Sequence, residues 1–146
     1  MASQNPFFTQ VEQELIQHAI VEAESNTSGE IRVHVESFCK GDPMKRALFL
    51  FHTLGMNKTR HHNGVLFYIA MKSHKLAIIG DKAIHEKVSQ SFWNQLKEHL
   101  VQSFAKNRYT EALVEAILKT GIELKKAFPH ESSDQNELPD EISFGS

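Results

Sequence analysis

The stretch Asn63-Gly-Val-Leu-Phe-Tyr-Ile-Ala-Met-Lys-Ser-His-Lys-Leu-Ala-Ile-Ile-Gly-Asp81 decides the fold class. It contains two apolar runs, residues 65–71 and 76–79, which are joined by a short polar break. A break that short cannot hold a crossover, so the two runs must pair as an antiparallel hairpin. Because both runs are apolar on both faces, the hairpin is expected inside a layered α/β domain. The polar residues that flank it then lie at one edge of the sheet.

The residues before the hairpin complete a βαβ unit. Apolar positions at helical spacing predict a helix over about residues 8–25, and the alternation over residues 30–37 predicts a strand with one polar face near the sheet margin. Asp42 as N-cap and Pro43 at the first helical position start a second helix, which Gly55 ends. Strand, helix and strand in this order predict a right-handed crossover.

The residues after the hairpin predict a short helix over about 82–88, a longer helix around 92–104, and a last helix that Pro129 ends. The expected fold is therefore α/β: a three-layer α/β/α sandwich on a small mixed sheet, formed by residues 1–128. Residues 129–146 are polar and acidic, which predicts a mostly disordered tail.

Composition bounds the class of protein. The chain has 146 residues, of which 40% are hydrophobic, so it suits one domain with a full core. The tail holds five acids and no Lys or Arg, which leaves 16 basic residues against 13 acidic ones elsewhere. That excess is too weak for a dedicated nucleic-acid binder.

Cysteine usage and hydropathy indicate the compartment. The single Cys39 excludes an internal disulfide framework. Neither a signal-peptide pattern nor a run of ~20 apolar residues is present, so membrane insertion is not expected. We therefore expect a soluble, cytoplasmic protein.

Several motifs together resemble the TPM domain family, which is named after thylakoid-lumen, photosystem II repair and nematode receptor-auxiliary proteins. They are Asn63-Gly64-Val65-Leu66, Ile78-Ile79-Gly80, the strand Ser28-Gly29-Glu30-Ile31-Arg32-Val33-His34-Val35, and Phe92-Trp93. The resemblance covers roughly residues 9–128. It is nearest to the soluble bacterial branch, which carries a tail similar to residues 136–143.

The resemblance implies an α/β/α sandwich, and it implies acid-phosphatase activity in some members and binding of a divalent cation such as calcium in others. Many members have Asp directly before Asn-Gly, where this chain has His62. The change removes one candidate ligand for a hard cation.

Strand direction brings several polar residues to one sheet edge. If the first two strands are parallel, Glu30, Asn63 and Asp81 meet there, and two carboxylates with an amide suit Ca²⁺ or Mg²⁺. Arg60 and His61, together with Asn63, are candidates to bind a phosphate oxyanion. The alternative is that Asp81 only caps the following helix and that Glu30 pairs with a surface Lys or Arg.

The opposite edge offers Glu36 and Asp42 as a reserve pair of metal ligands, although Asp42 is already explained as an N-cap. Cys39 and Arg46 do not form a cysteine-phosphatase loop, because six residues separate them where five are needed and no glycine-rich cradle follows. The histidines lack the spacing of a zinc site. No catalytic residue is assigned.

Three hypotheses remain open. The first is a TPM-domain protein that binds a divalent cation and acts as an interaction or assembly module with little or no catalysis. The second is a low-activity, metal-dependent phosphomonoesterase. The third is regulation through the acidic tail, in which Leu138, Ile142 and Phe144 dock on a protein partner.

Overall fold

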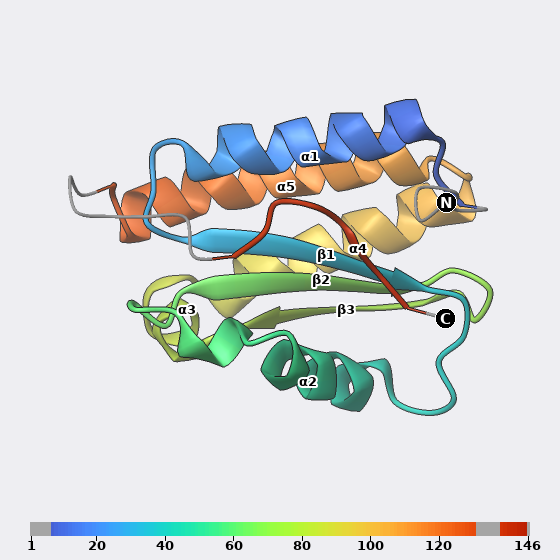
Figure 1. Ribbon diagram of the computed structural model, residues 1–146, viewed down its shortest axis with the longest axis horizontal. Coiled ribbons are helices and arrows are strands. Elements are labelled where there is room, and N and C mark those ends of the chain that lie inside the picture. The colour runs from blue at the N-terminus through green and yellow to red at the C-terminus, as the bar shows by residue number, and fades with distance from the viewer. Residues whose placement is uncertain (1–6, 131–137, 146) are drawn as a thin grey trace.

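A computed structural model describes residues 7–130 and 138–145, and its centre is a mixed sheet with the strand order β3-β2-β1-β4 (Figure 1). The strands are β1 (Glu30–Glu36), β2 (Gly64–Ala70), β3 (Lys75–Gly80) and β4 (Ser143–Phe144). β1 is parallel to β2 and to β4, whereas β2 and β3 are antiparallel. The predicted hairpin and the predicted mixed sheet are thereby confirmed.

Helices cover both faces of this sheet (Figure 1). One face packs against α1 (Gln10–Glu24), α4 (Gln90–Ala105) and α5 (Tyr109–Ala127), and the other packs against α2 (Pro43–Thr53). The short elements η1 (Met56–Lys58) and α3 (Lys82–Lys87) flank the hairpin. The predicted α/β/α layering is confirmed.

Side-chain alternation in the strands decides what each face buries. Ile31, Val33 and Val35 of β1 belong to the core shared with α1, α4 and α5. In β2, Leu66 and Tyr68 point the other way and join the smaller core under α2. β2 is buried along its whole length, whereas β3 is an edge strand and is only partly buried. The sequence therefore identified the central strand correctly but overestimated the burial of its partner.

The polar face of β1 is the main departure from the alternation argument. Glu30, His34 and Glu36 are each no more than 4% exposed, although the alternation predicted a polar face near the sheet margin. They are buried because α2 and the end of the chain cover them. The elements that cover this polar face come from distant parts of the sequence. The local alternation of residues therefore could not show that the face is buried.

The end of the chain is ordered where it is described, and we call residues 138–145 the C-terminal segment. Leu138 and Ile142 are buried at 8% and 7% exposure, β4 pairs with β1, and the Gly145 N–H donates to the Val35 carbonyl. The expectation of a mostly disordered tail is therefore wrong for this segment, while residues 131–137 lie outside the described part of the chain. The sequence marked Leu138 and Ile142 as docking residues but assigned them to a protein partner, because isolated apolar residues do not show which surface they pack against.

No helix among the described residues is long and apolar enough to cross a membrane.

Replacing Leu138 with Ala tests whether the C-terminal segment belongs to the core. Leu138 is buried against the α2 core, so we expect the free energy of unfolding to fall by about 2 kcal/mol or more in urea denaturation. Ile122→Ala is the control, because Ile122 is 57% exposed on α5 and should change stability by less than ~0.5 kcal/mol. Equal effects of the two changes would contradict the docked segment.

Candidate functional site

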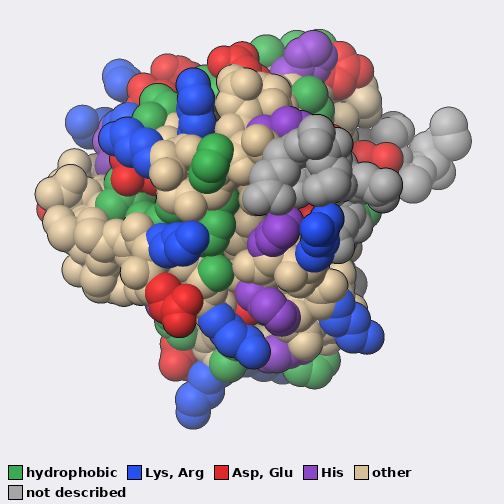
Figure 2. Space-filling view, turned by 90° about the vertical axis from the view of Figure 1, so that its left-hand side faces the viewer, with side chains coloured by type: hydrophobic (Ala, Val, Ile, Leu, Met, Phe, Trp, Pro, Cys, Tyr) green, Lys and Arg blue, Asp and Glu red, His purple; other side chains and the backbone are tan. Residues whose placement is uncertain are grey.

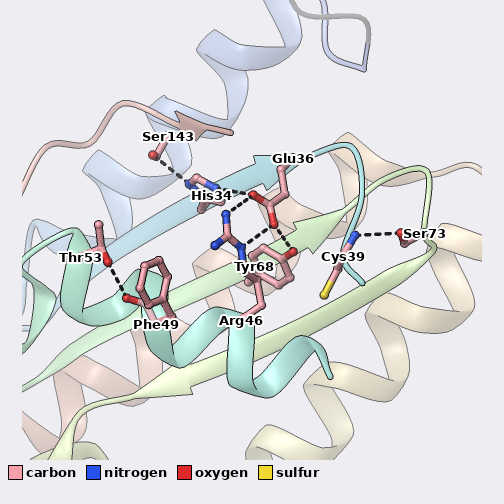
Figure 3. Close-up of polar contacts among 9 residues, drawn as sticks. All are labelled: His34, Glu36, Cys39, Arg46, Phe49, Thr53, Tyr68, Ser73 and Ser143. Atoms are coloured by element: carbon pink, nitrogen blue, oxygen red, sulfur yellow. Dashed lines mark hydrogen bonds and ion pairs between the residues drawn. The ribbon is translucent and has the colours of Figure 1, made fainter. Parts of the chain in front are cut away.

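Glu36, the last residue of β1, holds a buried carboxylate at the carboxyl edge of the sheet (Figure 3). Arg46 of α2 donates to it twice, from Nε to Oε2 at 3.0 Å and from Nη2 to Oε1 at 2.9 Å. The Tyr68 hydroxyl of β2 donates a third hydrogen bond to Oε2. Arg46 reaches the carboxylate because α2 begins at Pro43, immediately after the Asp42 cap, and lies over this face of the sheet. The site is thus a carboxylate held by three donors.

His34 extends this cluster toward the C-terminal segment. Its Nε2 lies 3.4 Å from Glu36 Oε1, and its Nδ1 lies 2.9 Å from Ser143 Oγ. A Cβ added at Gly145 would lie 2.6 Å from Glu36 Oε1 and 3.0 Å from His34 Nε2. The C-terminal segment therefore closes over the His34–Glu36 pair, and only a residue without a side chain fits at that point.

The protonation states follow from burial and hydrogen bonding. Burial alone would raise the pKa of Glu36, but the hydrogen bonds from Arg46 and Tyr68 outweigh it, and the pKa is lowered. Burial lowers the pKa of His34, an effect that Glu36 opposes. Burial and the hydrogen bond to Glu36 raise the pKa of Tyr68. At neutral pH the cluster holds an ionised Glu36, a neutral His34 and a protonated Tyr68, and a carboxylate with three donors is a poor general base.

A double-mutant cycle on Glu36 and Arg46 tests this cluster. Arg46→Met removes two donors from a buried carboxylate and should lower the free energy of unfolding by about 1–3 kcal/mol at pH 7. Adding Glu36→Gln should recover part of that loss, because the amide carries no uncompensated charge. Urea denaturation measures both.

The pH dependence of the free energy of unfolding is a second measurement on the same double-mutant cycle. The folded-state pKa of Glu36 is depressed, so its contribution is present above the ordinary value of 4.5 and is lost as the pH falls through the folded value. The Arg46→Met effect should therefore shrink in acid. Lys45→Met, at an exposed neighbouring position, is the control. Additive single-mutant effects would mean that Arg46 does not stabilise Glu36.

The opposite edge of the sheet holds the residues that the sequence predicted to converge. The register pairs Glu30 with Gly64 and Val65 with Gly80. The Glu30 N–H donates to the Asn63 carbonyl at 3.3 Å, and the Asp81 N–H donates to the Gly64 carbonyl at 3.0 Å. These backbones therefore meet at one edge, as expected. Figure 2 views the molecule from this end and shows histidine, lysine and arginine side chains gathered there.

Asp81 and Asn63 each have one side-chain polar atom that is hydrogen-bonded and one buried oxygen that is not. Asp81 Oδ1 caps α3 by accepting from the Lys82 N–H at 2.8 Å, whereas Oδ2 lies 3.5 Å from His62 Nδ1. Asn63 Nδ2 donates to Ser28 Oγ at 3.1 Å. Asp81 Oδ2 and Asn63 Oδ1 are buried and have no hydrogen-bond partner among the described residues. Asp81 therefore caps α3, as the alternative interpretation predicted, but only its Oδ1 takes part in the cap.

Glu30 and Glu24 tie the C-terminal segment to this end of the sheet. The Glu30 carboxylate accepts from the backbone N–H of Leu138. Glu24, at the end of α1, accepts from the Ile31 N–H at 2.8 Å. Burial, together with a hydrogen bond to Asp140, raises the pKa of Glu24 to about 10. Glu24 therefore keeps its proton at neutral pH and shares it with the Asp140 carboxylate.

Glu24→Gln tests this proton. The folded-state pKa of about 10 lies above the ordinary value of 4.5, so the contribution of Glu24 is fully present below 4.5 and is lost as the pH rises toward 10. Glutamine stays neutral, so the variant should have a higher Tm than the wild type at pH 8 and a flatter pH dependence. Glu22→Gln, at an exposed position of α1, should leave the profile unchanged. A lower Tm for Glu24→Gln at pH 8 would refute the shared proton.

The other predicted residues occupy separate places. Arg60 and His61 precede Asn63 in the loop between η1 and β2, so they lie near the Asp81 edge. Asp42, the reserve ligand, caps α2 by accepting from the Met44 N–H at 2.9 Å. Within residues 7–130 and 138–145, no group of three or more His, Cys, Asp or Glu side chains is placed to hold a metal ion. A cation at either edge would therefore need amide, hydroxyl or backbone oxygens as well.

Four residues of the Glu36 cluster did not enter the sequence prediction as site residues: His34, Arg46, Tyr68 and Ser143. Two of them carried a signal. His34 and Glu36 share a face of an alternating strand, and Tyr68 places a hydroxyl within an otherwise apolar run. Arg46 and Ser143 carried none, because their contacts depend on how α2 and the C-terminal segment pack.

The fold and these two edges define a small α/β/α domain, and its family follows from comparison with known proteins. Residues 2–122 match the model of the TPM domain, so the chain belongs to that family. It is similar over 99% of its length to the BA42 protein of the psychrophilic bacterium Bizionia argentinensis, whose NMR structure is covered completely at 41% identity and a TM-score of 0.89.

Two more distant NMR structures share the fold. The N-terminal domain of the cg2496 protein of Corynebacterium glutamicum is 14% identical, with 89% of this chain and 81% of that one covered at a TM-score of 0.65. The N-terminal domain of a protein from P. gingivalis is also 14% identical, with coverages of 86% and 83% and a TM-score of 0.69. No curated protein matches the chain.

Proposed function

We propose that this TPM-domain protein binds a hard divalent cation, Ca²⁺ or Mg²⁺, at the edge formed by Asn63 and Asp81, and that it serves as an interaction or assembly module with little or no catalysis. One observation carries the proposal. Asp81 Oδ2 and Asn63 Oδ1 are buried oxygens without a hydrogen-bond partner among the described residues.

Unsatisfied buried oxygens are costly, at about 1–3 kcal/mol each, and a cation would satisfy both. η1 and the loop that follows it contain two more buried oxygens without a hydrogen-bond partner among the described residues, Asn57 Oδ1 and Thr59 Oγ1. Hard cations accept carboxylate, amide and hydroxyl oxygens. A ligand set with so few charges favours weak binding, with a dissociation constant roughly in the micromolar to millimolar range.

Glu30 and Asp81 remain the preferred pair of carboxylate ligands for the cation, although Glu30 already has a hydrogen-bond partner. Its carboxylate already accepts from the Leu138 N–H, so a cation that recruits Glu30 competes with the C-terminal segment. The reserve pair suits a cation less well. Glu36 is surrounded by donors from Arg46 and Tyr68, and Asp42 is occupied as a helix cap.

The interaction role is supported by exposed apolar side chains rather than by the tail. Leu138 and Ile142, which the sequence assigned to a partner, are buried in the core of this chain. Leu48 and Phe49, adjacent in sequence on the outer face of α2, are 49% and 59% exposed, and contiguous exposed apolar side chains are a feature of interaction sites. A protein partner is therefore proposed at α2.

A metal-dependent phosphomonoesterase is the second candidate. The observation that favours it is the gathering of basic side chains at the Asp81 end of the molecule in Figure 2. A bound cation would polarise a phosphoryl oxygen, and Arg60 and His61 would supply positive charge to the other oxygens. His62 stands where many relatives have Asp, so slow turnover is the expectation.

Titration of ¹⁵N-labelled protein with CaCl₂ and MgCl₂ tests the cation. Shifts are expected first in residues 57–64 and 81–83. Asp81→Asn should weaken binding on the order of tenfold, as is typical when a residue that supports a metal site is changed. Asparagine remains a good N-cap, so α3 should persist. Glu86→Gln, on the exposed face of α3, is the matched control.

Either of two results overturns the cation proposal: no shift with either cation, or shifts that Asp81→Asn leaves unchanged. Assaying the same proteins on an aryl phosphate separates the two candidate functions. Metal-dependent turnover near 10 s⁻¹, the typical enzyme value, would establish the phosphomonoesterase over the interaction module.

A further inference from the structure

A cavity of about 390 Å³ lies at the carboxyl edge of the sheet, away from the proposed cation site. Ile69, Met71 and Leu76 of the hairpin form one wall, and Val101 and Phe104 of α4 form the other. The hairpin turn and the connection between α4 and α5 lie at the same end of the molecule (Figure 1). This volume falls at the lower end of the range for small-molecule sites, about 300–1,000 Å³.

The charged side chains that line this cavity, Lys75 and Lys97, are both basic. His74, Lys75 and Lys97 belong to its lining, and none of the described residues that line it is acidic. Lys75 Nζ donates to the carbonyls of Cys39 at 3.0 Å and Gly41 at 2.7 Å, which fixes the ammonium beside the cavity and leaves one of its three protons for another acceptor. Lys97, on the exposed side of α4, has no ion pair among the described residues.

We propose that this cavity binds a small amphipathic carboxylate, with an aryl or branched alkyl body against the apolar walls and its carboxylate toward Lys97, Lys75 and His74. The apolar body is recognised by burial against Ile69, Leu76 and Phe104. The negative charge of the ligand is recognised because the charged side chains that line the cavity, Lys75 and Lys97, are cationic, which disfavours a ligand that carries an amine.

The site is independent of the cation edge. β2 contributes Gly64 at one end and Ile69 and Ala70 at the other, and seven residues of strand span about 20 Å. Ligands in α/β sheets commonly bind beyond the carboxyl ends of parallel strands, which is the end of β2 that this cavity uses. The proposal of a carboxylate site is therefore independent of the proposed cation site, and each can be refuted without the other.

Titrating ¹⁵N-labelled protein with 4-phenylbutanoate, and separately with 4-phenylbutanamide, tests the proposal. The carboxylate should shift residues 69–76 and 97–109, and the neutral amide should bind several-fold more weakly. Lys97→Gln should weaken carboxylate binding by up to about fivefold, the range for a partly exposed ion pair, without affecting the amide. Lys119→Gln, at an exposed position of α5, is the matched control.

A variant that fills the cavity keeps the proposal falsifiable. Ala105→Phe lies at an exposed position of the lining near the end of α4, so it should fold normally and abolish the shifts of both compounds. Equal affinity for the carboxylate and the amide, or unchanged binding in Ala105→Phe, overturns the proposal. Shifts of the same residues that grow with protein concentration alone would show a second copy in the cavity and would also overturn it.

Discussion

The buried carboxylate of Glu36 is the constraint on which one whole face of the sheet depends. Once β1 pairs in parallel with β2, the face that carries Glu30, His34 and Glu36 must turn toward α2. A buried charge is tolerated only with partners, and Arg46 and Tyr68 supply them from α2 and β2. The position of α2 over the sheet is therefore set by a polar contact as well as by the apolar residues beneath it.

The same constraint explains the path of the end of the chain. β1 has backbone groups along the edge away from β2 that β2 leaves unpaired, and it has the polar side chains of Glu30 and His34 on one face. The C-terminal segment forms hydrogen bonds with both sets of groups. Gly145 N–H reaches the Val35 carbonyl, Ser143 reaches His34, and the Leu138 N–H reaches Glu30. Gly145 occurs where the segment passes over the cluster, because a side chain there would collide with Glu36 and His34.

Local sequence pattern was sufficient for the main helices and for β1, β2 and β3, but not for β4 or for the contacts between elements. Hydrophobic periodicity and the Asp42-Pro43 helix start predicted the βαβ unit, and a short polar break predicted the hairpin. Strand direction was enough to bring Asn63 and Asp81 to one edge. The Glu36 cluster could not be predicted, because the alternating pattern of the strand indicates a solvent-facing carboxylate. Only the positions of α2 and the C-terminal segment show that it is buried. For the same reason, the sequence predicted that Leu138 docks but not that it docks on the core of its own chain.

The two edges differ in how completely their polar atoms are satisfied, and this difference assigns their roles. At the carboxyl edge each oxygen of Glu36 has a donor, so the cluster holds structure together and has no spare capacity for a ligand. At the amino edge, Asp81 Oδ2 and Asn63 Oδ1 are buried without a hydrogen bond among the described residues, although His62 Nδ1 lies 3.5 Å from Asp81 Oδ2. Unpaired buried oxygens lower the free energy of unfolding of the cation-free protein. A cation that binds them removes this cost, so the same atoms increase the affinity for the cation. The less satisfied edge is therefore the one where we expect the cation, whereas the Glu36 cluster at the carboxyl edge stabilises the fold.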